Sequence, residues 1–473
     1  MEILSKVFGF IVNDLGSTIV LPLIMMIVGK AFGMKWKEAF SSGLLLAVAF
    51  KAVGLVTGYM SDMICPVGKS MAETVGRSFP IVDGGWAPLS SITWSWKYAF
   101  LMFPIQIGVN LLMLALKKTK TLNIDMWNVW GKAFIGYLTV AATGKLYLGI
   151  LMAIVMIVME LILGDAMQPR VQRITGIENV SCPHRHMLLC SLIYPVDMLL
   201  RKIPFLNKDL NLNTLRKKFG LLFERHILGF ILGTMFGLIA GKKVIESVQL
   251  GIIAATALYL LPIVVRIFMM ALNPIADAAT SRMKKVLKSD QEVYIGLDNP
   301  MLLGEDAIWI VVMMCMPVTL LLAFLLPWNQ ILPFAALDNL TLGLCVYMVT
   351  NGNILRMFIL YIAFTPAYLW VATTLAPTIS ALGIENGIIS EGTLIASAGM
   401  DCPIFVYAFS RLFTFLQGNF VPLIIAVIYI IGFIYTVKGF KKEGLADKAA
   451  LLQSNLQHIT RNQYAGVIRH IGI

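Results

Sequence analysis

The stretch "LGILMAIVMIVMELILG", residues 148–164, decides the fold class, because Glu160 is its single charged residue. About 20 apolar residues form a helix long enough to cross the roughly 30 Å hydrocarbon core of a membrane. Comparable runs recur along the 473 residues, of which 58% are hydrophobic and 14% charged; a soluble domain averages about 45–50% and roughly 25%. The sequence therefore predicts an all-α polytopic membrane protein, since a β-barrel would show short alternating strands instead.

Long apolar runs predict about eleven transmembrane helices. Four stretches between them are too long and too apolar for plain loops, and each mixes Pro and Gly with polar residues. Irregular backbone is tolerated at membrane depth where protein or a water-filled cavity satisfies it, so these stretches predict re-entrant hairpins. The expected helices are 8–32, 38–60, 97–117, 126–143, 146–164, 226–241, 246–270, 307–327, 335–350, 355–376 and 418–438, and the expected hairpins are 61–96, 166–206, 271–306 and 377–411.

The two halves of the chain match each other at a shift of 208 positions. The shared shift and the matching order of spans and hairpins predict an internal duplication. The first repeat, 1–225, has five spans and two hairpins; the second, 226–440, has spans six to eleven and two hairpins; 441–473 is a cytoplasmic tail. The matching pairs are Gly29 and Gly237, Gly33 and Gly241, Glu38 and Glu246, Gly43 and Gly251, Ala47 and Ala255, Ala49 and Ala257, and Pro66 and Pro274.

Charge predicts how the halves face. With eleven spans and an outside N-terminus, "KKTK" at 117–120 and the tail "KGFKKEG" fall in the cytoplasm, as basic loops should. The basic stretch 165–225 also falls inside, whereas its acidic counterpart 377–410 falls outside. The repeats are therefore expected to be inverted, as in alternating-access carriers with a site near the midplane. The net charge of +12 fits this topology without nucleic acid as a partner.

Several chemistries are not expected. The six cysteines are scattered without a CxxC pair, which predicts neither a disulfide framework nor a zinc site. No Walker loop or Rossmann fingerprint occurs, so no nucleotide cofactor and no ATP-driven step are expected. Ionisable residues inside spans, such as Lys132, are functional candidates in principle, but we favour a structural role for them.

Two hairpins carry polar groups beside an aromatic ring. The segment "VDGGWAPLSSITW", 82–94, offers Asp83 and Trp86, and its counterpart "GLDNPMLLGEDAIW", 296–309, offers Asp298 and Asn299. Carboxylate and amide groups beside a ring suit a polyhydroxylated ligand. The segment "NIDMWNVW", 123–130, adds Asn128. The alternative is that the Asp-Gly and Asp-Asn-Pro sequences are turns and the tryptophans form an interfacial belt.

The third polar segment is "GIENVSCPHRHMLLC", 176–190, in which Pro183 breaks a hairpin directly before His184. His184 and His186 lack the third and fourth ligands of a zinc site, so no metal is expected here. We predict that His184 contacts the ligand, and an imidazole can also accept a proton near neutral pH.

These motifs, in this order, resemble the galactitol-type membrane component (IIC) of the bacterial phosphoenolpyruvate-dependent sugar phosphotransferase system. The start "NDLGSTIVLPLIMMIVGKAFGM", the segments quoted above, "NQILPF" at 329–334 and "NGNILR" at 351–356 all take part. The resemblance implies a plasma-membrane homodimer embedded in lipid, with a core domain moving against a scaffold. It also implies a polyol substrate bound by Asp83, Trp86, Asn128, His184, Asp298 and Asn299. Arg185 and His186 depart from the small polar residues that follow Pro-His in relatives.

The function predicted is inward translocation of a galactitol-like sugar alcohol with concomitant phosphorylation. The resemblance places the phosphoryl donor on a separate IIB protein, itself charged by IIA, so this chain is the substrate-binding and translocating subunit. If phosphorylation is involved, His184 is the candidate catalytic residue, as a base for the attacking hydroxyl. The alternative function is an ion-coupled secondary transporter of a polyol or sugar.

Overall fold

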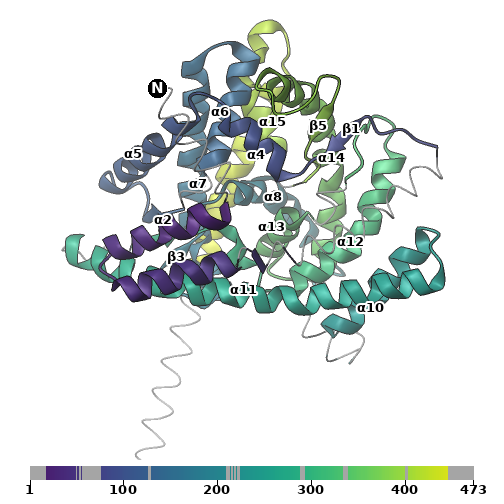
Figure 1. The fold of residues 1–473 in the computed structure, drawn as a ribbon, viewed down its shortest axis with the longest axis horizontal. Helices are drawn as coiled ribbons and strands as arrows, with labels where there is room; N and C mark the ends of the chain where they lie inside the picture. Colours follow the sequence, from purple (N-terminus) through teal and green to yellow (C-terminus); the bar gives the residue numbers. More distant parts are fainter. Residues whose placement is uncertain are drawn as a thin grey trace, which may run out of the picture.

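The computed structural model describes residues 17–49, 51–52, 55, 76–125, 129–208, 214, 217, 220, 224–287, 293–333, 339–399 and 403–445. The described chain is mostly helical, with a few very short strands buried among the helices (Figure 1). Its first half contains α2 (Ser17–Ala31), β1 (Ile81–Asp83), α4 (Trp86–Trp94), η2 (Ala99–Leu101), α5 (Met102–Ala115), β2 (Thr121–Asn123), α6 (Val129–Thr143), α7 (Leu146–Thr175), β3 (Val180–Ser181), η3 (Arg185–Leu189) and α8 (Cys190–Leu200).

The second half repeats a similar alternation of helices and short strands. Figure 1 shows the long helix α11 running along one side of the molecule, with α2 packed on it near one end and α10 near the other. The elements are α10 (Arg225–Ile239), α11 (Val244–Leu287), β4 (Tyr294–Gly296), η5 (Asn299–Leu302), α12 (Asp306–Leu325), α13 (Leu340–Thr350), α14 (Ile354–Glu385), β5 (Leu394–Ala396), α15 (Ile404–Ser410), η6 (Leu412–Gln417) and a last helix, Val421–Leu445.

Four helices of the described chain are long and apolar enough to cross a membrane, by length and composition. They are α7, α12, α14 and the last helix; α7 and α14 contain the predicted spans 146–164 and 355–376, and the other two overlap 307–327 and 418–438. Shorter apolar helices are α5, α13 and the start of α11. The prediction of a mostly helical chain with several membrane-length apolar helices is therefore confirmed, and the total of about eleven spans stays a prediction.

Three helices extend into stretches that were predicted as hairpins. Helix α7 continues through Asp165 and Pro169 to Thr175, and α14 continues through Pro377 to Glu385. Helix α11 likewise runs on to Leu287. A proline removes one backbone hydrogen bond, but packed membrane helices tolerate it because neighbouring groups satisfy the freed carbonyl. The polar residues used to place these boundaries therefore lie inside helices, and α7 stops only at Gly176, which has φ 70°.

Two small parallel sheets each combine strands from both halves. Strand β1 pairs with β5 in one sheet, and Ile331 forms a bridge to Ile81 on the same strand. In the other sheet β4 lies between β2 and β3. The pairing is reciprocal, because the first strand of each half meets the last strand of the other.

Element bounds in the two halves coincide at the same shift of 208 that the sequence shows. Moved by that shift, Ser17–Ala31 becomes Arg225–Ile239, which are the bounds of α2 and α10. The first residue of α7, Leu146, becomes Ile354, the first residue of α14. These coincidences are what an internal duplication predicts.

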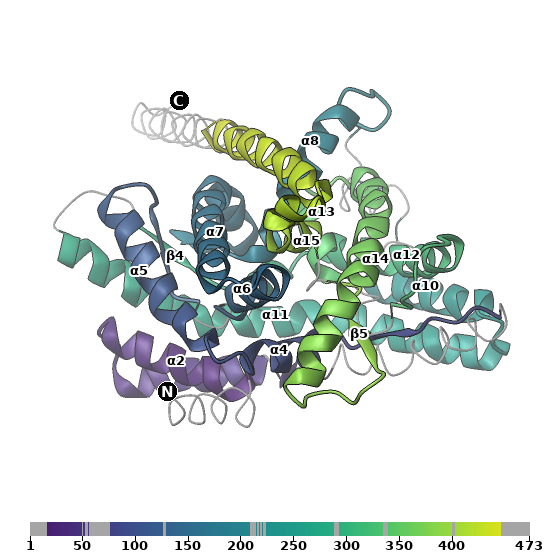
Figure 2. The same ribbon diagram turned by 90° about the horizontal axis from the view of Figure 1, so that it is seen from above.

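A cluster of charged side chains ties helices of both halves together. We call Arg170, Arg201, Arg356, Asp197 and Glu443 the arginine cluster. Asp197, fully buried in α8, accepts from Arg201 and from Arg356, both at 2.7 Å. Glu443 in the last helix accepts from Arg201 at 2.7 Å and pairs with Arg170 of α7. Figure 2 shows the last helix passing beside α8 and α13. Glu443 lies in the predicted tail 441–473, and the last helix extends into that segment as far as Leu445.

Candidate functional site

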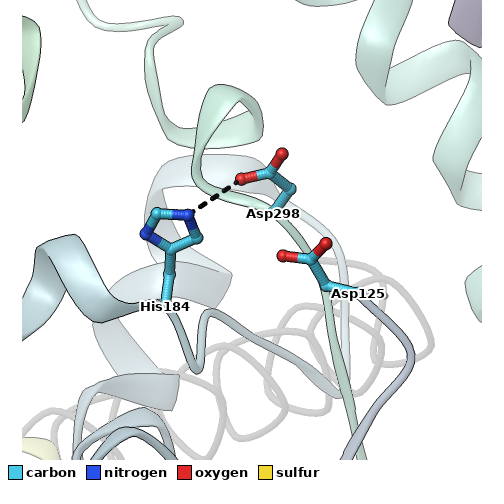
Figure 3. A group of neighbouring side chains, drawn as sticks. All are labelled: Asp125, His184 and Asp298. Carbon is cyan, nitrogen blue, oxygen red and sulfur yellow. Dashed lines mark ion pairs between the residues drawn. The ribbon is translucent and has the colours of Figure 1, made fainter. Parts of the chain in front are cut away.

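Three side chains, two buried and one partly exposed, meet where the strands of one sheet end. Asp125 follows β2, Asp298 follows β4 and His184 follows β3, each within three residues of the strand end. Their ligand-type atoms all lie within 4.8 Å of one another (Figure 3). The strands are parallel, so their carboxyl ends share one edge of the sheet. Binding sites of parallel sheets are typically built at that edge. We call Asp125, His184 and Asp298 the strand-end site.

Pro183 fixes the backbone that carries His184. It packs into space left by two glycines, because a Cβ on Gly164 would lie 3.1 Å from Pro183 and one on Gly296 would lie 2.6 Å from it. Gly164 belongs to α7 and Gly296 is the last residue of β4. A side chain at either glycine would therefore displace Pro183 and the imidazole that follows it.

Hydrogen bonds settle the tautomer of His184. Its Nδ1 accepts from the backbone N–H of His186 at 3.1 Å, which leaves the ring proton on Nε2. That Nε2 lies 3.4 Å from Oδ1 of Asp298. The contact is longer than the 2.7–2.9 Å or so of a charge-assisted bond, so it is a weak interaction. Both ring nitrogens of His184 are therefore occupied in this arrangement, one by backbone and one by the carboxylate.

His186 and Asn299 extend the site on one side. Nδ1 of His186 lies 3.0 Å from Nδ2 of Asn299, and because an amide nitrogen only donates, Nδ1 of His186 is the acceptor. The imidazoles of His184 and His186 lie 4.4 Å apart, edge to face. Nε2 of His186 is buried and has no hydrogen-bond partner among the described residues. A buried donor in this position costs free energy unless something binds it.

Burial holds both histidines neutral. Burial is the largest cause lowering the pKa of His184 well below 6.5, and the nearby guanidinium of Arg185 lowers it further. The pKa of His186 is lowered well below 6.5 as well, first by burial and then by His184. Asp298 would favour a charged His184, but its contact is too long to offset desolvation. His184 is therefore a neutral donor at cytoplasmic pH.

Further buried charges lie in η3 and near its histidines. Lys132 of α6 pairs with Glu160 of α7 at 2.5 Å, and each side chain is only 1% exposed. Arg185 is fully buried, and its guanidinium lies 4.1 Å from the ring centroid of Trp130. The ion pair agrees with a structural role for Lys132. Arg185 replaces the small residue that relatives have at this position. Its guanidinium lies over an aromatic ring, and this cation–π contact stabilises the hairpin.

The predicted residues fall into three groups. His184, Asp298 and Asn299 lie together in and beside the strand-end site. Trp86 is connected to this group only through other residues. Its ring packs edge-on against Trp130, and the guanidinium of Arg185, the residue after His184, lies over the ring of Trp130. Asp83 is the last residue of β1 and lies in the other sheet. Its Oδ1 accepts from the backbone N–H of Gly85, before α4, at 3.3 Å and from that of Ala398, after β5, at 3.2 Å. Asn128 lies outside the described residues.

Asp125 and His186 were not predicted as site residues. Asp125 is 4% exposed, and its backbone is held by Asn123, whose Oδ1 accepts from the N–H of Asp125, and by Gln106, whose amide donates to its carbonyl. The chain around it offers one signal. "LNID", 122–125, and "IGLD", 295–298, both place an aspartate two residues after a strand, and β2 and β4 are paired in the sheet.

Two carboxylates and a neutral imidazole can serve two kinds of ligand. Such a set can coordinate a divalent cation, and it can accept from and donate to the hydroxyls of a polyol. Among the described residues, Asp125, His184 and Asp298 form a group of side chains whose ligand atoms are close enough together to hold a metal ion. Oxygen ligands on opposite sides of one Ca²⁺ ion, each at about 2.3–2.6 Å, lie about 4.6–5.2 Å apart, so a spread of up to 4.8 Å fits either kind of ligand.

Comparison with known proteins identifies the family. Residues 10–392 match the family described as "PTS system sugar-specific permease component". The chain belongs to this family. It is 32% identical over 449 residues to the "PTS system galactitol-specific EIIC component" of Escherichia coli K12, covering 93% of this chain and 98% of that protein. The protein of the same name from Escherichia coli O157:H7 matches equally, and a "Putative permease IIC component" of strain K12 is 30% identical over 440 residues, with 92% and 99% covered.

As a sugar-specific permease component of the phosphotransferase system, the chain is a membrane transport protein, in agreement with its apolar helices. The family prediction made from the motifs is confirmed. The strand-end site supplies two carboxylates and an imidazole from both halves of the chain, and His186 and Asn299 beside it add an imidazole and an amide.

Proposed function

We propose that this permease carries galactitol or a closely related sugar alcohol inward and presents it for phosphorylation by a separate IIB protein, which a IIA protein recharges. The observation that supports the proposal is the strand-end site: Asp125, His184 and Asp298 within 4.8 Å of one another. Galactitol is the named substrate of two relatives that match 98% of their length.

The chemistry of the site fits a polyol. Each hydroxyl of a sugar alcohol donates one hydrogen bond and accepts others, so it needs both kinds of partner. Asp125 and Asp298 are acceptors, while the Nε2–H of His184 and the second N–H of the Asn299 amide are donors. We include Asp83, Trp86 and Asn128 in the proposed substrate-binding set, with Trp86 covering the C–H face of the ligand. A substrate hydroxyl satisfies the buried polar groups of the site. A ligand that lacks this hydroxyl leaves those groups unpaired, so the site binds it less well.

Phosphoryl transfer requires that the attacking hydroxyl lose its proton. We propose His184 as the residue that contacts this hydroxyl. Its ring proton is on Nε2, so acceptance of a further proton by His184 requires that Nδ1 release the N–H of His186. A carboxylate needs no such rearrangement. Asp298, 3.4 Å from His184, is therefore the more direct proton acceptor, and His184 orients it.

The internal duplication supports a proposal for the transport movement. We propose two inverted repeats, 1–225 and 226–440, an outside N-terminus and a cytoplasmic C-terminus, and a homodimer whose core domains move against a scaffold in elevator fashion. The equal shifts of α2 to α10 and of α7 to α14 support the duplication. Labelling of single cysteines should place Lys208 inside and Glu385 outside. Labelling of both from one face would contradict the inverted arrangement.

Uptake in cells tests the function. Cells that express the chain with and without IIA and IIB receive a panel of labelled hexitols, pentitols and hexoses. The expected product is intracellular polyol phosphate, formed only when both soluble proteins are present. Free polyol that accumulates without them would contradict the proposal and would favour the ion-coupled carrier, in which paired carboxylates take up a proton.

A further inference from the structure

We propose that a basic pocket beside α5 binds the phosphate-bearing headgroup of an anionic membrane lipid. The pocket has a volume of about 370 Å³. Four lysines line it, and the single acidic residue of its lining is Asp165. Three of the lysines follow α5 directly, whereas the fourth comes from the last helix; they are Lys117, Lys118, Lys120 and Lys441. We call this the lysine pocket.

Asp165 is the single acidic residue lining the lysine pocket, so it can offset only one of the four lysine charges. Its carboxylate accepts from the backbone N–H of Lys120 at 3.0 Å and from Oγ1 of Thr121 at 2.8 Å. Within the residues that the structure describes, Lys117, Lys118 and Lys441 form no salt bridge. Clustered positive charge on a concave wall attracts anions and concentrates them there.

The lysine pocket lies where three apolar helices become polar. Helix α5 is apolar up to Ala115, directly before the first of the lysines. The apolar run of α7, 148–164, ends directly before Asp165. In the last helix the first lysine is Lys438, one turn before Lys441. This level is the interface between hydrocarbon and water, where lipid phosphates lie.

Exposed leucines adjoin the charged groups. Leu112 and Leu116 of α5 are 58% and 59% exposed, and Leu445 of the pocket wall is 70% exposed. A lipid presents a phosphate to cations and acyl chains to an apolar surface, so it matches both features. Basic pockets between transmembrane helices on the cytoplasmic side are a recurring form of lipid recognition. An acidic soluble protein would match the lysines but not the exposed leucines. If the lysines served only to orient the chain in the membrane, Lys441 would not need to lie beside the end of α5.

The experiment compares two doubly substituted variants of the full chain. Lys118→Gln with Lys441→Gln removes two charges from the lysine pocket. Lys438→Gln with Lys442→Gln removes two exposed charges from the same last helix outside the pocket. Each protein is purified, checked for a single elution peak and unchanged circular dichroism, and placed in nanodiscs of phosphatidylcholine with a minor fraction of phosphatidylglycerol. Native mass spectrometry then measures which lipid stays bound.

The unmodified chain should retain phosphatidylglycerol over phosphatidylcholine. The pocket variant should lose about 30-fold of that preference, since each lysine near an anionic surface contributes about fivefold, and the control variant should keep most of it. Equal behaviour of the two variants would overturn the proposal. So would displacement of the lipid by millimolar glycerol phosphate, which would assign the pocket to a soluble phosphate. If the pocket variant keeps its lipid but loses phosphorylation by IIB in pure phosphatidylcholine, the pocket docks a protein instead. Lipid retention needs no substrate, so this result is independent of the transport proposal.

Discussion

The strand-end site and the arginine cluster both bury charged side chains, yet their contacts differ. In the arginine cluster, Asp197 uses both carboxylate oxygens in hydrogen bonds of 2.7 Å to two guanidinium groups. In the strand-end site, the contact between His184 and Asp298 is 3.4 Å, and a neutral imidazole is the donor. Short, charge-assisted pairs favour one fixed arrangement, whereas a long contact to a neutral imidazole costs less to exchange for a contact to a ligand.

This difference separates stability from function. Removal of a member of the arginine cluster should unfold the protein more readily without a specific effect on the substrate. Removal of a member of the strand-end site should affect the substrate more than the fold, because titratable groups with perturbed pKa values cluster at functional positions.

The largest effect is expected from Asp197→Asn. The substitution leaves the guanidinium of Arg356, which is 8% exposed, without its carboxylate. Breaking a buried ion pair from one side costs about 3–5 kcal/mol of unfolding free energy. Unfolding of the purified protein in detergent measures it. Glu246→Gln is the control, because the Lys242–Glu246 pair is 3.8 Å apart and largely solvated, and its loss should cost about 1 kcal/mol or less. Equal costs would remove the contrast.

Asp298→Asn should have the second largest effect, on turnover. The amide keeps the size of the side chain but loses the negative charge and the capacity to accept a proton. Phosphorylation of substrate by IIB should fall by roughly 10²-fold, with the unfolding free energy nearly unchanged. Single-turnover phosphorylation and detergent unfolding are measured on the same sample. A large loss of stability with normal turnover would assign Asp298 to the structural class.

Acid should destabilise the strand-end site. His184 and His186 are neutral when folded, because burial lowers the pKa of each well below 6.5. Below pH 6.5 the unfolded chain binds protons that the folded chain does not, so stability falls as pH falls. Two such groups together remove about 2–3 kcal/mol between pH 7.5 and pH 5.5. The double variant His184→Gln with His186→Gln should show a flatter profile over this range. Identical slopes would mean that the histidines do not titrate in this way.

The smallest effect is expected from His184→Gln alone. Glutamine retains a donor but not the geometry of the imidazole, so polyol affinity should fall by about 1–2 kcal/mol, the usual cost of an unpaired buried group. Isothermal titration with galactitol measures the affinity, and single-turnover phosphorylation measures the base role. A fall in turnover of roughly 10²-fold with normal affinity would establish His184 as the base after all. No change in either quantity would make it an ordinary buried histidine.

The sequence predicted the class of fold and two of the three residues of the strand-end site. His184 and Asp298 could be found because Pro-His and Asp-Asn-Pro stand out among apolar runs. Asp125 could not be ranked, since only the pairing of β2 with β4 brings it to the other two. Helix ends were misplaced where charge and proline occur inside helices, as at Asp165. Glu443 was missed because the last helix continues beyond the predicted end of its span at 438, through lysines that interrupt the apolar run, to Leu445.

The reciprocal pairing of strands has a consequence for biogenesis. When the ribosome has made β1, its neighbour β5, which begins at Leu394, does not yet exist. Strand β3 likewise waits for β4, which begins at Tyr294. The first half therefore leaves the ribosome with strand edges that no strand of that half pairs with. Unpaired strand edges can pair with other chains and aggregate. If the gene is divided between α8 and α10, neither product should yield a functional permease alone, whereas simultaneous synthesis of both should restore one.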